Sequence, residues 1–381
     1  MSDVFTEIHH GDCVEVMGDM EEESVHAIVT DPPYGLAFMS RSWDDFDPQE
    51  YEDFCRDWAE AAYDALKPGG HLLAFSGNRT HHRMMTGVEK AGYEIRDTIT
   101  WHYASGMPKG RNVSKAIDDE MDVEREVSRT KTFTQGGGNA LNMREGEEHE
   151  VEHEYTEPGS DEAKKWDGWN TTLSPATEFV VVARKSLAAD TVEENVLTHG
   201  TGALNIDGTR PDGGRWTANV VYDEAEAAQL DEEVGELSSG AYPSERNTAG
   251  YEGGFKQGET GHSRVETDAG GPSRYFYTSK AKQSERSVDG SVDNPHPTVK
   301  PIDLMEWLVK LVTHEKQIVL DPFLGSGTTL MATWNMGRSG IGIERNDEHV
   351  ETARERVEAN KSDRSAVGTK PTHDHESALE W

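Results

Sequence analysis

The chain is poor in cysteine, in long apolar runs and in positive charge. Its 381 residues include two cysteines, Cys13 and Cys55, in no metal-ligand spacing, which argues against a disulfide framework and against a structural zinc site. No apolar run approaches the roughly 20 residues needed to cross a bilayer. The segment Met1–His10 also lacks the charged and then apolar pattern of a secretory signal. We therefore expect a cytoplasmic protein with no membrane partner and no bound metal.

Acidic residues are in large excess, with 72 Asp and Glu against 37 Lys and Arg and a formal net charge of −35. Proteins that bind nucleic acid normally carry a basic surface, because neutralising phosphates supplies much of the affinity. The acidity taken alone argues against DNA. Adaptation to molar salt is a second explanation, since self-repulsion is then screened within about 3 Å. We favour salt adaptation, because the acids are spread through loops and helices alike.

Short apolar strands and amphipathic helices alternate over much of the chain, which is typical of an α/β fold with a Rossmann-like, doubly wound sheet. We expect Phe179–Ala183 to pair with Ile95–Tyr103 across the polar stretch between them. The other expected strands are Val4–Ile8, His26–Thr30, His71–Ser76, Gln317–Leu320 and Ser339–Ile343. The expected helices are Cys13–Met20, Tyr51–Leu66, Thr80–Ala91, Ile302–Thr313 and Thr328–Met336.

The sequence Asp31-Pro32-Pro33-Tyr34 follows the second expected strand. An exocyclic amino nitrogen on a base is a poor nucleophile, because its lone pair is delocalised into the ring. The Asp31 carboxylate and the Pro32 carbonyl can accept its two hydrogens and free that lone pair. Neither proline has an N–H, so the turn is rigid, and Tyr34 offers a flat face to an extruded base. The competing interpretation is a plain strand-ending turn in which the aspartate caps a helix.

A glycine-rich turn follows the strand Gln317–Leu320 and precedes a helix, which is where doubly wound sheets bind nucleotide-like ligands. Its sequence is Asp321-Pro322-Phe323-Leu324-Gly325-Ser326-Gly327-Thr328. It lacks the Lys-Ser/Thr of a phosphate loop and the third glycine of the dinucleotide fingerprint. Glu344, after the next strand, can chelate a ribose diol. A ligand with ribose and no pyrophosphate fits this set, and a structural turn or a nicotinamide site is the alternative.

Together these motifs resemble the amino-methylating DNA methyltransferases. The Asp31 motif precedes the Asp321 motif, as in the β-group of that family with its permuted motif order. Three further segments resemble family motifs, namely Gly11-Asp12-Cys13, Leu66–Gly70 and Asn294–Pro301. The resemblance implies a circularly permuted S-adenosylmethionine-dependent methyltransferase sheet, with S-adenosylmethionine as cofactor and double-stranded DNA as partner. It implies a site-specific enzyme that methylates N6 of adenine after base flipping, since Asp before Pro-Pro-Tyr favours adenine over cytosine.

The resemblance also implies roles for individual residues. Asp31 and Pro32 would grip the target amino group, with Tyr34 stacked on the base and Pro33 in the same catalytic turn. The cofactor would be bound by Asp12, Cys13, Thr298, Lys300, Asp321, Phe323, Gly325, Ser326, Gly327, Thr328 and Glu344. Among these, Thr298 and Lys300 would hold the cofactor carboxylate, and Glu344 the ribose.

Positive charge, although scarce, is clustered in two islands. Basic residues interleaved with aromatics suit phosphate contacts and base stacking, although a solvated surface run is the plain alternative. The first island is Lys109, Arg111 and Lys115, and the second is Arg274, Lys280 and Lys282, beside Tyr275, Phe276 and Tyr277. Arg210 and Arg215-Trp216 are assigned to the surface of the second island. These residues are the expected DNA contacts.

The resemblance and the composition together suggest a division of the chain. We expect residues 1–104 to form the first part of the catalytic core, 105–170 an acidic and partly mobile insertion, 171–186 a core strand, 187–286 a target-recognition region, 287–360 the cofactor-binding part and 361–381 a disordered tail. The open alternatives are an N4-cytosine methyltransferase, an RNA methyltransferase and an inactive DNA-binding regulator. A restriction endonuclease partner and a homodimer are also left open.

Overall fold

The structure is a computed structural model of the whole chain. It describes residues 4–36, 44, 46–104, 106, 110–135, 149–211, 215–238, 269–279, 285, 287–288, 290–292, 294, 296 and 299–366. Among these residues no helix is long and apolar enough to span a membrane.

In the part of the chain that the structure describes, nine strands form one sheet in the order β1-β13-β12-β2-β3-β7-β4-β8-β11. Only β7 runs antiparallel to its neighbours β3 and β4, and the other pairs are parallel. The predicted α/β, Rossmann-like sheet is therefore confirmed, as is the predicted pairing of β7 with β4. The strands are β1 (Thr6–His10), β2 (Val25–Thr30), β3 (Leu66–Ser76), β4 (Glu94–His102), β7 (Thr177–Arg184), β8 (Val220–Asp223), β11 (Tyr277–Ser279), β12 (Ile318–Asp321) and β13 (Ser339–Glu344).

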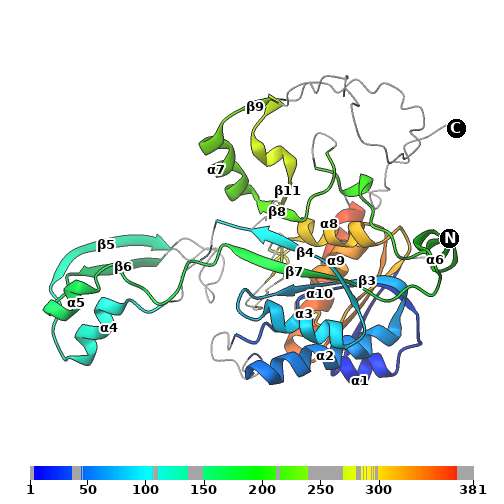
Figure 1. Cartoon of the computed structure of the whole chain (residues 1–381), viewed down its shortest axis with the longest axis horizontal. Coiled ribbons are helices and arrows are strands. Elements are labelled where there is room, and N and C mark those ends of the chain that lie inside the picture. Colours follow the sequence, from blue (N-terminus) through cyan, green and yellow to red (C-terminus); the bar gives the residue numbers. More distant parts are fainter. Residues whose placement is uncertain are drawn as a thin grey trace, which may run out of the picture.

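Helices cover both faces of the sheet (Figure 1). One face carries α1 (Cys13–Gly18), α2 (Pro48–Ala65) and α3 (His81–Lys90), and the other carries α8 (Ile302–Val312), α9 (Thr328–Asn335) and α10 (Asp347–Ala366). Side chains of β3 alternate between these two cores, since Leu72 packs in the first and Leu73 in the second. Burial on both faces is why the central strands are so uniformly apolar.

The segment Lys67-Pro68-Gly69-Gly70 was expected to stop a helix before a strand that begins at His71. Helix α2 does end at Ala65, but β3 already begins at Leu66 and includes this segment. Gly69 has φ +76, and a Cβ there would approach the Asn195 amide to 2.4 Å. The glycine therefore allows the close approach of α6 (Val192–His199) to the strand.

An arm projects from the sheet between β4 and β7 (Figure 1). It consists of α4 (Val113–Glu120), the hairpin β5 (Val127–Gln135) and β6 (His149–Thr156), and α5 (Asp161–Lys165). Its internal anchor is the buried carboxylate of Asp118, which accepts hydrogen bonds from Arg125 and Ser160. The acidic insertion predicted at 105–170 thus contains regular structure that the sequence analysis did not anticipate.

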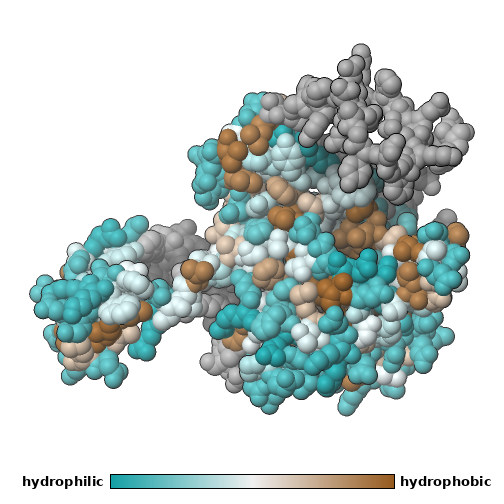
Figure 2. Space-filling model, in the orientation of Figure 1, coloured by the Kyte–Doolittle hydropathy of each residue, from teal (hydrophilic) through white to brown (hydrophobic). Residues whose placement is uncertain are grey.

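The predicted target-recognition region, 187–286, contributes directly to the core sheet. Strands β8 and β11 extend the sheet beyond β4, and α7 (Glu224–Val234) with β9 (Leu237–Ser238) and β10 (Ala269–Gly270) lies beside them. Figure 2 shows hydrophilic residues over much of the visible surface of the core and the arm. The tail expected from residue 361 is corrected in part, because α10 continues to Ala366. Residues 367–381 lie outside the described part of the chain.

Candidate active site

The Asp31 motif follows β2 and the Asp321 motif follows β12. The two motifs meet where these neighbouring strands mark the reversal of strand order in the sheet. Strands β12 and β2 are parallel neighbours, with Leu320 opposite Ile28. The Oγ1 of Thr30, the last residue of β2, donates a 2.7 Å hydrogen bond to Oδ1 of Asp321, the last residue of β12. In doubly wound sheets, ligands bind outside the carboxyl ends of the strands at this kind of switch point. The arrangement identifies this edge as a ligand site.

A pocket of about 1600 Å³ opens at this edge. Its lining includes both motifs, the Gly11–Val14 turn, Asn78 and Arg79, and the segment Thr171–Glu178 that leads from the arm into β7. Pockets for a single small ligand commonly measure roughly 300–1,000 Å³. The pocket is therefore large enough for two ligands that lie side by side.

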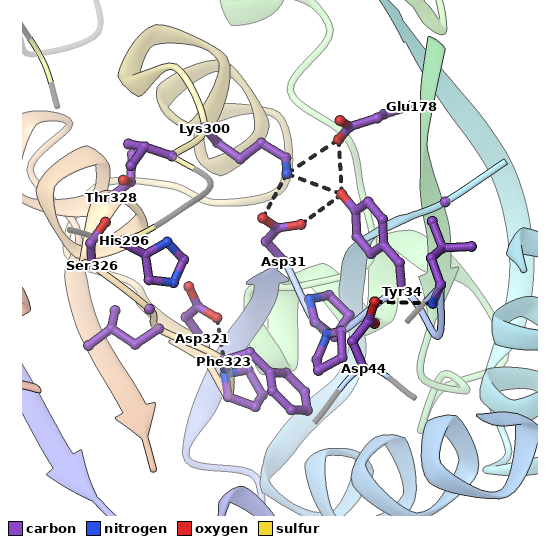
Figure 3. Close-up of a pocket in the computed structure, with 18 of the residues that line it drawn as sticks. Asp31, Tyr34, Asp44, Glu178, His296, Lys300, Asp321, Phe323, Ser326 and Thr328 are labelled. Carbon is purple, nitrogen blue, oxygen red and sulfur yellow. Dashed lines mark hydrogen bonds and ion pairs between the residues drawn. The ribbon is translucent and has the colours of Figure 1, made fainter. Parts of the chain in front are cut away.

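Four polar side chains form a cluster in the pocket (Figure 3). The Lys300 Nζ lies 2.7 Å from Asp31 Oδ2 and 3.3 Å from Glu178 Oε2. The Tyr34 hydroxyl donates to Asp31 Oδ1 at 2.8 Å or to Glu178 Oε2 at 2.9 Å. It also accepts from Lys300 Nζ at 3.1 Å. Two carboxylates and one ammonium give the cluster a net negative charge.

The cluster fixes the ionisation of two of its members. Burial by itself would lower the pKa of Lys300, but Asp31 and Glu178 outweigh burial and raise it above its ordinary value. Burial raises the pKa of Tyr34, and the neighbouring carboxylates raise it further. The lysine is consequently a permanent cation and the tyrosine a neutral hydrogen-bond donor at neutral pH.

This geometry changes the expectation for Lys300. Its ammonium was expected at the cofactor carboxylate, and in the structure it contacts Asp31 and Glu178. The lysine therefore belongs with the Asp-Pro-Pro-Tyr turn in this arrangement. Glu178 was not anticipated, because a single glutamate at the start of an apolar strand has no distinctive local signal. The predicted pairing of its strand with β4 was the one clue to its position.

The turn itself is held rigidly. The Tyr51 hydroxyl donates to the Pro33 carbonyl at 3.0 Å, and the Thr80 hydroxyl donates to the Tyr34 carbonyl at 2.6 Å. Between described residues, no hydrogen bond takes up the Pro32 carbonyl. Asp31 and this carbonyl are thus the two acceptors that the turn presents.

The glycine-rich turn lines the opposite part of the pocket. Gly325 has φ +54 and Gly327 has φ +90, which favour glycine. A Cβ at Gly325 would approach the His296 ring to 3.0 Å, so the turn passes close to that ring. Glu344 Oε2 accepts from the Gly325 N–H at 2.9 Å, and its carboxylate also lines the pocket. Glycines and a fixed carboxylate leave space and an acceptor for a ribose-bearing ligand.

Buried polar contacts set the shape of this turn. Burial raises the pKa of Asp321 to about 6, against hydrogen bonds from Thr329, Thr30 and the Phe323 N–H that lower it. Arg356, a fully buried residue of α10, donates to the Ser326 hydroxyl at 2.8 Å and also contacts the Thr328 hydroxyl. Arg356 was missed in the sequence, because α10 itself was not predicted.

Asp12, Cys13 and Phe323 also lie at the pocket, whereas Gly327 is not among its lining residues and Thr298 is outside the described residues. Asp12 caps α1 by accepting from the Val14 N–H at 3.0 Å. Burial raises the pKa of the Cys13 thiol to about 12, so this cysteine is not a thiolate nucleophile. Phe323 packs edge-on against Trp58 with ring centroids 5.6 Å apart. All three line the pocket.

Half of the six predicted DNA contacts can be placed in the structure. Lys109, Lys280 and Lys282 lie outside the described residues. Arg111 is exposed at the base of the arm and Lys115 is half-buried on α4. Arg274 donates to the carbonyls of Gly270, Gly271 and Leu237, which is a structural use of its guanidinium. The guanidinium groups of Arg215 and Arg274 both lie over the Tyr275 ring. Arg215 therefore lies beside Arg274 of the second island, as expected.

A doubly wound sheet with a glycine-rich ligand turn and an Asp-Pro-Pro-Tyr turn in one pocket defines the class of Rossmann-like amino-methyltransferases. Within that class, the chain belongs to the N6_N4_Mtase family, described as DNA methylase, whose model matches residues 25–355. It is an enzyme of DNA amino-group methylation, and the nicotinamide alternative is thereby overturned.

Similar proteins agree with this family. The type II methyltransferase M.HindIII of Haemophilus influenzae is 22% identical over 377 residues, covering 89% of this chain and 91% of that protein. The type II methyltransferase M.HpaI of Haemophilus parainfluenzae is 23% identical over 348 residues, covering 91% and 72%. The solved structure of the cytosine-N4-specific PvuII DNA methyltransferase has a TM-score of 0.50 at 13% identity, covering 96% of this chain and 94% of that one. That likeness shows the fold alone.

Proposed function

We propose that this DNA methylase is site-specific and transfers a methyl group from S-adenosylmethionine to N6 of adenine. The observation that carries the proposal is the pair of acceptors at the end of β2. The Asp31 carboxylate and the Pro32 carbonyl stand in one pocket with the glycine-rich turn, to which β2 is joined through Thr30 and Asp321. Asp in place of Ser at the first position of the turn supports adenine over cytosine.

The pocket fits the cofactor on several counts. S-adenosylmethionine supplies a methyl group on a sulfonium and needs space beside its ribose and adenine. Gly325 lines the pocket without a side chain, and Glu344 and Asp12 supply carboxylates to the ribose and adenine. The volume of 1600 Å³ leaves room for a base beside the cofactor. Phe323 gives the site an apolar wall, which excludes water from the reacting atoms.

Residues of the Asp31 motif would orient and activate the amino group of the target base. A base extruded from the duplex would stack on Tyr34, and its amino hydrogens would be accepted by Asp31 and the Pro32 carbonyl. These hydrogen bonds withdraw the nitrogen lone pair from the ring and localise it on the nitrogen. That lone pair then forms the new N–C bond as the methyl–sulfur bond breaks. A proton from the methylated nitrogen passes to Asp31 or to water. Positioning of the two reactants supplies much of the rate.

The lysine has a defined place in this sequence of events. Lys300 lies 2.7 Å from Oδ2 of Asp31, the carboxylate that would accept from the amino group. Glu178 lies 3.3 Å away as a second acceptor for the ammonium. We therefore assign to Glu178 the holding of Lys300 while the base binds Asp31. The net negative charge of the cluster also favours the positive charge that develops on the nitrogen.

The direct test uses radiolabelled S-adenosylmethionine, duplex DNA and mass spectrometry of the released nucleosides, in high salt. The expected product is N6-methyladenine, and it is absent with Asp31→Ala while cofactor binding measured by calorimetry persists. N4-methylcytosine would overturn the adenine assignment but not the family. Label on RNA alone would overturn the DNA substrate, and bound cofactor with no turnover would indicate an inactive regulator.

Further properties of this function are also proposed. The protein acts in the cytoplasm of a salt-adapted cell, in keeping with its net charge of −35. Residues 187–286 include the target-recognition region, although β8 and β11 within them belong to the core sheet. A partner restriction endonuclease would cut the site that sequencing of modified DNA identifies. A homodimer would be seen by light scattering in the same high-salt buffer.

A further inference from the structure

Leu173 is the most exposed large apolar side chain of the described residues, at 91%. It stands in the segment between the arm and β7, and it lines the pocket that holds Asp31. An exposed leucine is by itself ordinary on a protein surface. What distinguishes Leu173 is that it combines this exposure with a place on the lining of the catalytic pocket.

The segment that carries Leu173 is anchored on both sides. The Arg111 N–H donates to Thr171 Oγ1 at 2.9 Å, and the Thr171 N–H donates to the Arg111 carbonyl at 3.2 Å. After the leucine, Ser174 Oγ donates to the Gly106 carbonyl at 2.6 Å, and the Tyr103 N–H donates to the Ala176 carbonyl at 3.1 Å. These bonds fix the backbone on either side while the leucine side chain meets solvent.

Positive charge accompanies this leucine in an otherwise acidic protein. Arg111 is exposed and is tied by its backbone to Thr171, two residues before Leu173. Arg79, also exposed, lines the same pocket. Arginine side chains are common partners of the phosphate oxygens of a duplex. The chemistry of this rim therefore fits a nucleic-acid duplex.

We propose that Leu173 is a wedge that enters the base stack of the duplex when the target base is extruded into the pocket. Extrusion leaves an apolar gap between neighbouring bases, and an inserted leucine fills that gap while its own surface leaves water. Arg111 and Arg79 bind the flanking phosphates. The inference rests on the proposed action on a flipped DNA base, but it does not depend on whether that base is adenine or cytosine.

The test compares Leu173→Ala with Leu197→Ala. Leu197 is the matched control, because it is 87% exposed but lies on α6 and does not line the pocket. The measurement is kcat/KM on a duplex with a paired target base and on the same duplex with that base mismatched. For Leu173→Ala we expect a loss of roughly 10-fold or more on the paired target. The loss should be within about 2-fold on the mismatch, where extrusion is already easy.

A second readout follows extrusion directly. With 2-aminopurine in place of a target adenine, or a fluorescent cytosine analogue in place of a target cytosine, binding of the wild type should raise the fluorescence. Leu173→Ala should raise it less, whereas Leu173→Met should restore the rise. Equal behaviour of the Leu173→Ala and Leu197→Ala variants on the paired duplex would overturn the wedge. So would equal losses on paired and mismatched targets, which would point to a structural role. A wild type that methylates no DNA would instead overturn the proposed function, and the wedge with it.

Discussion

The Lys300 ammonium lies 2.7 Å from Oδ2 of Asp31, and the Tyr34 hydroxyl lies 2.8 Å from the other carboxylate oxygen, Oδ1. Lys300 and Asp31 are far apart in sequence and come from the two ends of the permuted core. Under the proposed function, the ammonium competes with the incoming amino group for the Asp31 carboxylate, because both carry N–H donors. Whether the base can displace it depends on Glu178, its other partner at 3.3 Å.

We first predict that Glu178→Gln lowers kcat/KM for DNA by roughly 10-fold to 100-fold, since a hydrogen bond to a charged partner contributes about 1.5–3 kcal/mol. Without the second carboxylate, Lys300 is held more firmly on Asp31 and competes with the base. The KM for DNA should rise while the KM for S-adenosylmethionine stays the same. Steady-state kinetics with each substrate varied would measure this. Glu193→Gln, an exposed change in the first turn of α6, is the control and should leave both constants unchanged.

A second prediction concerns the lysine itself. Lys300→Met leaves Asp31 and Glu178 around the Tyr34 hydroxyl with no cation, so the cluster loses the ammonium that contacts both carboxylates. The kcat for DNA methylation should therefore fall by roughly 10-fold, and Lys300→Arg should restore part of it, as steady-state kinetics would measure. A raised KM for S-adenosylmethionine with an unchanged kcat would return Lys300 to the cofactor carboxylate.

The sequence was sufficient to predict the two motifs and the core strands, because each signal is local. Asp31 and Asp321 stand at the ends of apolar strands, and the carboxyl ends of parallel neighbours meet at one edge of a sheet. The contact between Thr30 and Asp321 then follows from strand order. That strand order results from the permuted order of the motifs, which was predicted from the family resemblance.

The residues that escaped prediction depend on tertiary register. Glu178 reaches the cluster because β7 pairs with both β3 and β4, with Phe179 opposite Ser76 and Thr100. The sequences of β5 and β6 contain few apolar residues, so their alternation is too weak to identify the two strands. Arg356 is charged but fully buried, which inverts the usual expectation for an arginine in a polar helix.

A third prediction follows from the raised pKa of Asp321, about 6 against an ordinary 3.8. Because the folded state binds this proton more tightly than the unfolded state, the stabilisation is present at low pH and is lost as pH rises through about 6. Relative to Asp321→Asn, the wild type should gain about 1 kcal/mol of unfolding free energy when pH falls from about 7.5 to about 5.

Urea unfolding of both proteins at the two pH values would measure this difference. Taking the difference between the proteins cancels the titration of the other acids, which are numerous in this chain. Asp119→Asn, an exposed change on α4, serves as the control and should follow the wild type at both pH values. A wild type that loses stability relative to Asp321→Asn on acidification would contradict the assignment of the shift to burial.

A fourth prediction tests salt adaptation. With a net charge of −35, repulsion between acidic side chains destabilises the folded state. Salt screens this repulsion, because it shortens the Debye length from about 10 Å at 0.1 M to about 3 Å at 1 M. The unfolding temperature should therefore rise steeply with KCl up to roughly 1 M and level off beyond it. Sulfate is unsuitable here because it also strengthens apolar burial. Scanning calorimetry in a KCl series would show the curve. A steady rise with no plateau would indicate salting-out of apolar surface, and an unchanged unfolding temperature would remove the case for salt adaptation.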